Sequence, residues 1–122
     1  MALAALALSL GGGAYAASSA GGSVEWAVVS ADGKLARGNG GVGAELLRPH
    51  GKPIPGNYEV LFNDDIRHCS YKATLGSAGP VPPPIGDVGV ARMHHLANAV
   101  YVHTTNANGA SADEGFHIAA IC

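Results

Sequence analysis

The chain has 122 residues and a formal net charge of −2, and only 13% of its residues are charged. This length suffices for a single domain, and the weak charge excludes an electrostatic footprint for nucleic acid or for an anionic membrane. Its 18 glycines and its short valine-rich runs, broken by Gly, Pro and Asn, predict an all-β fold with many turns.

The N-terminal segment has the pattern of a secretory signal peptide. An apolar run over residues 2–10 precedes Ala14-Tyr15-Ala16, which matches the small-x-small cleavage pattern. The run is too short to span a bilayer, and no basic residues precede it, so an upstream start or a plain alanine-rich tail are the alternatives. We expect a signal peptide over 1–16, with cleavage near Ala16.

A flexible, Gly-rich segment is expected over residues 17–23, followed by one domain over 24–122. The first strand is predicted over 24–30, with Val24, Trp26 and Val28 on its inner face. Trp26 is the only tryptophan, and we expect it to anchor the core.

A turn over residues 31–34 then leads into a short return strand over 35–37. The glycine-rich stretch 38–43 fits neither a dinucleotide fingerprint nor a P-loop, and no helix follows it. It is therefore interpreted as a turn or a bulge. A strand over 42–48 and a proline-broken loop over 49–56 come next.

Residues 58–75 alternate strictly and predict a β-hairpin. A register that pairs Phe62 with Cys69 places the apolar residues of both strands of the hairpin inward. It also sets Glu59 opposite Lys72, a favourable cross-strand pair. The inward residues are then Tyr58, Val60, Phe62, Cys69, Tyr71, Ala73 and Leu75.

The proline run at 80–84 favours an extended connection between sheets over a segment that docks in a partner's aromatic groove. Strands are predicted over 87–93, 98–105 and 116–122. Seven or eight short strands at roughly ten-residue spacing are typical of a two-sheet antiparallel sandwich or a jelly roll.

The expected export determines how the two cysteines are interpreted. Cys69 and Cys122 are an even pair in a chain bound for an oxidising compartment, so a disulfide is expected. The alternative is a pair of free thiols that ligate a metal.

The six histidines are the residues best suited to chemistry. His94 and His95 are adjacent, so on a strand they would face opposite sides and would not share one ion. His103 and His117 are both predicted to point outward, and a hairpin would bring them within reach of one Zn²⁺ or Cu²⁺. Two ligands are fewer than a structural zinc site needs, so solvent-facing histidines are the competing interpretation.

Loops are the expected binding surface, because a rigid β scaffold commonly recognises its ligands through them. We predict such a surface over 38–43, 64–67 and 106–115. Its candidate residues are Asn39, Asp64, Asp65, Asn106, Asn108 and Asp113. No Gly-x-Ser-x-Gly elbow is present, and no catalytic residue and no cofactor are predicted.

The chain resembles a group of uncharacterised small secreted bacterial proteins. The shared pattern comprises W-A-V-V with D-G, then Y-x-V-x-F-N-x-D, C-x-Y-x-A-T-x-G and a terminal F-H-x-A-x-x-C, and it covers most of residues 24–122. The resemblance implies export and the Cys69–Cys122 pair, and it implies no active site.

Together these observations predict an exported binding or structural module whose partner is an extracellular protein or a glycan, with no stable membrane span. A metal-dependent or hydrolytic enzyme that uses the histidine-bearing face is the first alternative. A homo-oligomeric jelly-roll subunit of a fibre is the second.

Overall fold

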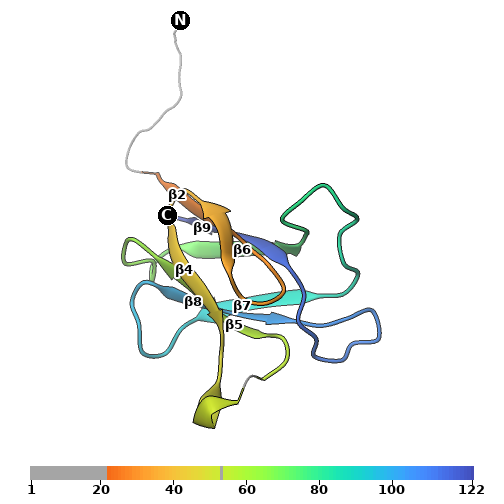
Figure 1. Cartoon of the computed structure of the whole chain (residues 1–122). Coiled ribbons are helices and arrows are strands. Elements are labelled where there is room, and N and C mark those ends of the chain that lie inside the picture. Colours follow the sequence, from red (N-terminus) through yellow and green to blue (C-terminus); the bar gives the residue numbers. More distant parts are fainter. Residues whose placement is uncertain (1–21, 53) are drawn as a thin grey trace, which may run out of the picture.

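The computed structural model of this chain describes residues 22–52 and 54–122, and this part of the chain contains eight strands (Figure 1). The predicted signal segment over 1–16 and residues 17–21 lie outside the described residues. The strands are β2 (Val24–Val29), β3 (Leu35–Gly38), β4 (Gly41–Leu46), β5 (Asn57–Phe62), β6 (Ser70–Leu75), β7 (Val88–Arg92), β8 (Ala99–Thr104) and β9 (Phe116–Ile121), with a short 3₁₀ turn, η1 (Pro49–Gly51), before β5.

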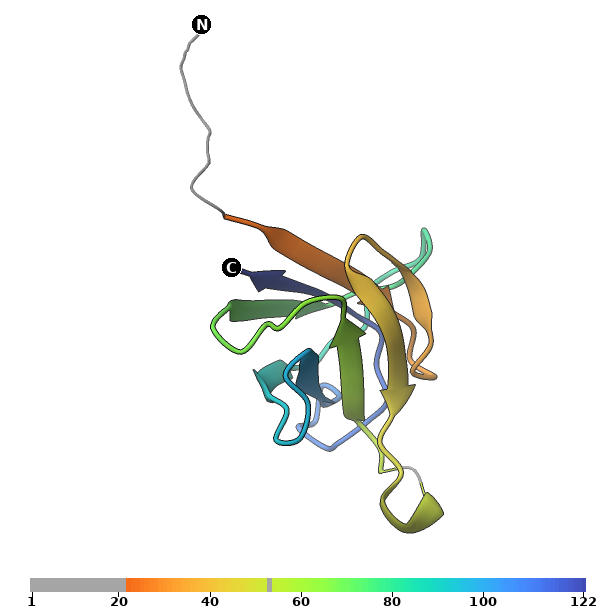
Figure 2. The same ribbon diagram turned by 90° about the vertical axis from the view of Figure 1, so that its left-hand side faces the viewer.

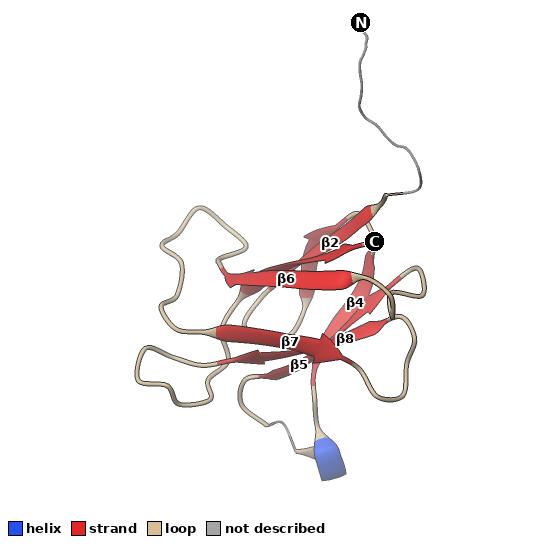
Figure 3. Ribbon diagram, turned by 180° about the vertical axis from the view of Figure 1, so that it is seen from behind, coloured by secondary structure: helices blue, strands red, loops and turns tan. Residues whose placement is uncertain are grey.

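The strands form two four-stranded antiparallel sheets, which confirms the predicted sandwich. The first sheet has the order β3-β2-β9-β6 and the second the order β4-β5-β8-β7. Figure 2 gives a second view of the ribbon, turned by 90° from Figure 1. At one edge of the sandwich β6 and β7 lie side by side (Figure 3). The proline-rich segment between them carries the chain from one sheet to the other, as expected.

The core lies between the sheets, and the predicted alternation of inward residues is confirmed for most strands. Tyr58, Val60 and Phe62 of β5 are fully buried, and they pack against the buried apolar residues of the opposite sheet. The ring of Tyr58 meets the edge of Phe116 with the ring centroids 5.0 Å apart, so one aromatic pair spans both layers.

The predicted hairpin over 58–75 is wrong, although both of its strands exist. β5 pairs with β4 and β8, whereas β6 pairs with β9 in the other sheet. Glu59 therefore lies opposite Glu45 and Tyr101, not opposite Lys72, and Phe62 does not pair with Cys69.

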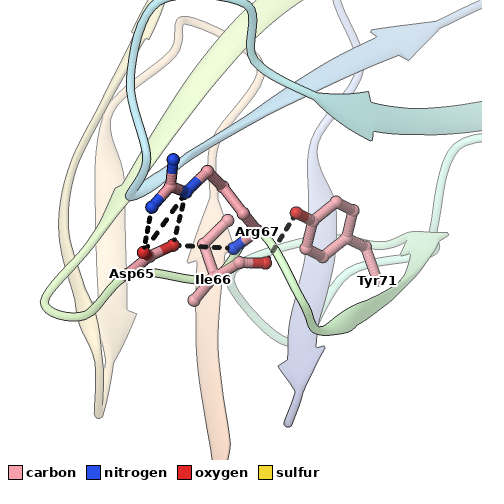
Figure 4. A network of polar contacts seen from close by, with 4 residues as sticks. All are labelled: Asp65, Ile66, Arg67 and Tyr71. Carbon is pink, nitrogen blue, oxygen red and sulfur yellow. Dashed lines mark hydrogen bonds and ion pairs between the residues drawn. The ribbon is translucent and has the colours of Figure 1, made fainter.

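The loop between β5 and β6 explains this separation. Ile66 at its centre is fully buried, and its N–H donates to the carbonyl of Ala97 at 2.9 Å. The hydroxyl of Tyr71 donates to the carbonyl of Ile66 at 2.7 Å (Figure 4). The loop thus closes one end of the core, and a tight turn would leave that end open to water.

The inward face of β2 is also the reverse of the prediction. Ala27 and Val29 are buried together with Glu25, while Val24 and Trp26 are 50% and 37% exposed. Of the three residues predicted to face inward, only Val28 is buried, at 3% exposed. Close packing explains why the small Ala27, and not Trp26, faces inward, because a methyl group on Gly41 would lie 2.8 Å from Cβ of Ala27. A bulky inward side chain at that point of β2 has no room.

The disulfide between Cys69 and Cys122 forms as predicted, with the Cα atoms 4.3 Å apart. It joins the residue before β6 to the residue after β9, next to the register pair Ser70–Ile121. The bridge spans 53 residues of sequence, a loop for which chain entropy predicts a stabilisation of about 4 kcal/mol. No helix in the described part of the chain is long and apolar enough to cross a membrane.

Candidate functional site

The first candidate site is a shallow hollow on the outer face of the first sheet, which we call the Trp26 hollow. Its volume is about 340 Å³. Three adjacent strands, β2, β9 and β6, line it. The lining residues are Trp26, Lys72, Ala73, Thr74, His117, Ile118 and Ala119.

Strand register creates the hollow. Trp26, Ala119 and Lys72 form one row across the three strands, since Ala119 pairs with both of the others. A methyl side chain between an indole and a lysine leaves a depression. The next row holds His117 and Thr74, so the apolar floor is bordered by groups that form hydrogen bonds.

His117 is held in place at the rim. Its Nε2 lies 3.0 Å from the carbonyl oxygen of Ser77. A carbonyl only accepts, so Nε2 carries the proton and Nδ1 is the acceptor of the neutral ring. The segment after β6 that supplies Ser77 is itself held by Arg37, whose guanidinium donates to the carbonyl of Ala78 at 2.7 Å.

Asn39, a predicted binding residue, supports this hollow from behind. Its side-chain oxygen accepts the backbone N–H of Trp26 at 2.7 Å, and its side-chain amide donates to the backbone carbonyl of Val24 at 3.0 Å. Both polar ends of the side chain are therefore bonded to the backbone of β2. Asn39 thus fixes the backbone of β2 on either side of Glu25.

The second candidate site is a polar cleft at the end of the sandwich where the β5–β6 and β7–β8 loops meet. Its volume is about 240 Å³, and its lining residues are Arg67, Arg92, Met93, His94, His95, Leu96 and Ala97. Asp65 pairs with Arg67 at 2.6 Å (Figure 4). Hydrogen bonds from Arg67 hold the pKa of Asp65 well below its usual range.

The predicted loop residues are divided between the two ends of the sandwich. Asp64 and Asp65 follow β5 at the disulfide end, whereas Asn106, Asn108 and Asp113 follow β8 at the opposite end. The far group is engaged in turns, since Asp113 accepts the N–H of Gly56 at 2.7 Å and Asn106 accepts that of Asn108 at 2.9 Å. No single loop surface contains all of these residues.

Glu25 is a buried carboxyl group that the sequence did not single out. It is 8% exposed, and its Oε1 accepts the N–H of Asn63 at 3.1 Å. Burial raises its pKa, and a side-chain hydrogen bond with Asp64 raises it further. Glu25 would be recognised as buried if its phase of β2 were taken to face inward. The sequence favours the opposite phase, because Val24 and Trp26 are more apolar than Glu25 and Ala27.

The predicted hairpin of His103 and His117 does not form, because β8 and β9 belong to different sheets. His103 lies on the outer face of the second sheet, with Nε2 2.9 Å from the hydroxyl of Ser111. Across residues 22–52 and 54–122, no group of three or more His, Cys, Asp or Glu side chains is placed to hold a metal ion.

His94 and His95 converge, whereas on a strand they would face opposite sides. They lie in the turn after β7, and their Nδ1 atoms are 3.2 Å apart. A turn lets consecutive side chains converge, whereas the pleat of a strand would separate them.

Comparison with known proteins adds no family to this description. No protein-family model matches the chain, and no curated protein and no solved structure matches it either.

Proposed function

We propose that this chain is an exported binding module and that the Trp26 hollow is its ligand site. The observation that carries the proposal is the solvent-exposed indole of the only tryptophan, set in a concave apolar surface with polar groups at its rim. Ligand sites combine an apolar, often aromatic, surface with a few placed polar groups in this way.

The proposed ligand is an oligosaccharide. A sugar ring has one face of C–H groups that stacks on an indole, and its edge carries hydroxyls that need donors and acceptors. Trp26 supplies the stacking surface, while Lys72, Thr74 and His117 supply the polar contacts. The hollow is open and shallow, which suits a chain of sugar rings lying across the strands.

The disulfide supports the proposed export. A disulfide persists in oxidising compartments such as the cell exterior, and the Cys69–Cys122 bridge ties down the end of β9, the strand that forms the floor of the hollow. The metal-dependent form of the enzyme alternative would use His103 and His117 together, and β8 and β9 do not bring them together. We therefore propose binding and assign no catalytic residue.

Tryptophan fluorescence tests the proposal, because the emission comes from one residue inside the site. An array of soluble glycans selects the oligosaccharides that bind, and each is then titrated while the emission of Trp26 is recorded. We expect a saturable change in emission for the unmodified chain. Trp26→Ala contains no tryptophan, so its binding is measured on the array, where we expect it to be lost. Lys72→Ala should weaken binding through the loss of one polar contact, by roughly tenfold.

Val81→Ala is the matched control, since Val81 is 62% exposed and lies in the proline-rich segment, outside the hollow. It should bind as the unmodified chain does. A glycan that binds Trp26→Ala and the unmodified chain equally would place the site elsewhere. An array without any bound glycan would contradict the proposed ligand class.

A further inference from the structure

The imidazole rings of His94 and His95 make an unusual contact in the polar cleft. The rings meet edge to face, with centroids 4.5 Å apart and Nδ1 atoms 3.2 Å apart. The two facing ring nitrogens form a hydrogen bond when one of them carries a proton and the other a lone pair, and a metal ion can take the place of that proton. A shared proton satisfies the pair, and so does a metal ion.

The distance between the two nitrogens matches a metal chelate. Transition-metal bonds to imidazole nitrogen are about 2.0–2.1 Å long. Two such bonds place the nitrogens about 2.9 Å apart at a right angle and about 3.3 Å apart at a tetrahedral angle. The observed 3.2 Å lies between these values, so the spacing of the two nitrogens suits a shared metal ion.

The surroundings favour a soft or borderline cation. Met93 lines the same cleft and offers a thioether. Thioether and imidazole donors together suit copper in both oxidation states, and Cu²⁺ has the highest affinity of the common divalent ions for nitrogen ligands. Oxygen-preferring ions such as Ca²⁺ lack carboxylate ligands among the lining residues.

Two arginines also line the cleft, and only one of them has its charge compensated by a neighbouring carboxylate. The charge of Arg67 is compensated by Asp65 at 2.6 Å. Arg92 forms no ion pair within the described part of the chain, so its guanidinium can hold an anion that completes the coordination of the metal.

We propose that Met93, His94 and His95 form a copper site, with the two Nδ1 atoms as the principal ligands. The site lies on the turn after β7, whereas the Trp26 hollow lies on the opposite sheet. Copper binding therefore stands independently of the proposed glycan binding.

Titration of the metal-free full chain with Cu²⁺ tests the site, followed by calorimetry and by electron paramagnetic resonance. We expect one equivalent whose spectrum shows nitrogen ligation. His94→Gln and His95→Gln should each lower the affinity by at least about tenfold, and the double variant should lose this equivalent. Copper should also raise the melting temperature of the unmodified chain but not that of the double variant.

His50→Gln and His68→Gln are the matched controls, because both histidines are exposed and lie outside the cleft. Each should keep the equivalent that His94 and His95 bind. Met93→Leu should weaken Cu⁺ binding under reducing conditions more than Cu²⁺ binding. Equal copper affinity in the double variant and the unmodified chain would overturn the proposal, as would a cleft that binds inorganic sulfate and no copper.

Discussion

At the scale of single residues, burial and pairing decide the behaviour of Glu25. Its carboxyl lies at the closed end of the core, beside Asp64 and under the N–H of Asn63. Because its pKa is higher in the folded state, the folded chain binds the proton more tightly than the unfolded chain. The stability that Glu25 contributes is therefore present below its unfolded pKa and is lost as the pH rises through its folded pKa.

Glu25→Gln should consequently stabilise the protein at neutral pH. The amide oxygen keeps the bond from Asn63, the amide nitrogen can donate to Asp64, and no charge has to be buried. Urea unfolding at pH 7 should show a higher free energy of unfolding for the variant, and the gain should shrink as the pH falls towards the ordinary pKa of a glutamate. Glu114→Gln, in the loop before β9, controls for the loss of one negative charge. A gain that does not depend on pH would contradict the account.

At the scale of elements, alternation predicts which residues of a strand face inward and says little about which strands pair. Tyr58, Val60 and Phe62 were assigned correctly because three large apolar residues in one phase need burial. The partner of β5 was not predictable in the same way. Pairing β6 with β9 depends on Ile66 closing the end of the core, which is a contact between distant segments.

The candidate sites illustrate the same limit. The disulfide followed from residue type and the inferred compartment, and it was predicted correctly. The Trp26 hollow depends on which face of β2 meets the core, and the more apolar phase of that strand, with Val24 and Trp26, is the one that faces outward. The convergence of His94 and His95 depends on where β7 ends, and a shift of one or two residues there changes strand geometry into turn geometry.

The junction of β5, β8 and the loop before β9 provides a test at this scale. Gly56 has a positive φ of 78°, and a methyl group there would lie 2.4 Å from the carbonyl oxygen of Thr104. Gly51 has a φ of 81° and open space around it. Thermal unfolding should show that Gly51→Ala costs about 1 kcal/mol, and that Gly56→Ala costs at least about 2 kcal/mol more. Equal costs would mean that the junction is not closely packed.

At the scale of the whole molecule, the disulfide fastens the C-terminal strand to the rest of the first sheet. β9 lies between β2 and β6, and Cys122 also donates its N–H to the carbonyl of Ser23 at 2.8 Å. Both ends of the described chain therefore meet at one corner, which Figure 1 shows. Loosening this corner exposes the central strand of the sheet that carries the Trp26 hollow.

Replacing both cysteines with serine should lower the free energy of unfolding by about 4 kcal/mol, a large share of the net stability of a small domain. Denaturant unfolding with and without reductant measures the effect. Reduction of the unmodified chain should reproduce the loss, and the double variant should not respond to reductant. If reductant does not change the free energy of unfolding of the unmodified chain, the bridge contributes nothing to stability.

The central claim is that Trp26 faces water on the outer side of β2, where a ligand can reach it, and not the core. Acrylamide quenching of the native protein's tryptophan fluorescence tests this directly. The account predicts ready quenching of the folded chain, with a slope well above that of a buried indole. Emission that resists acrylamide until the protein is unfolded would place Trp26 in the core and would contradict the account.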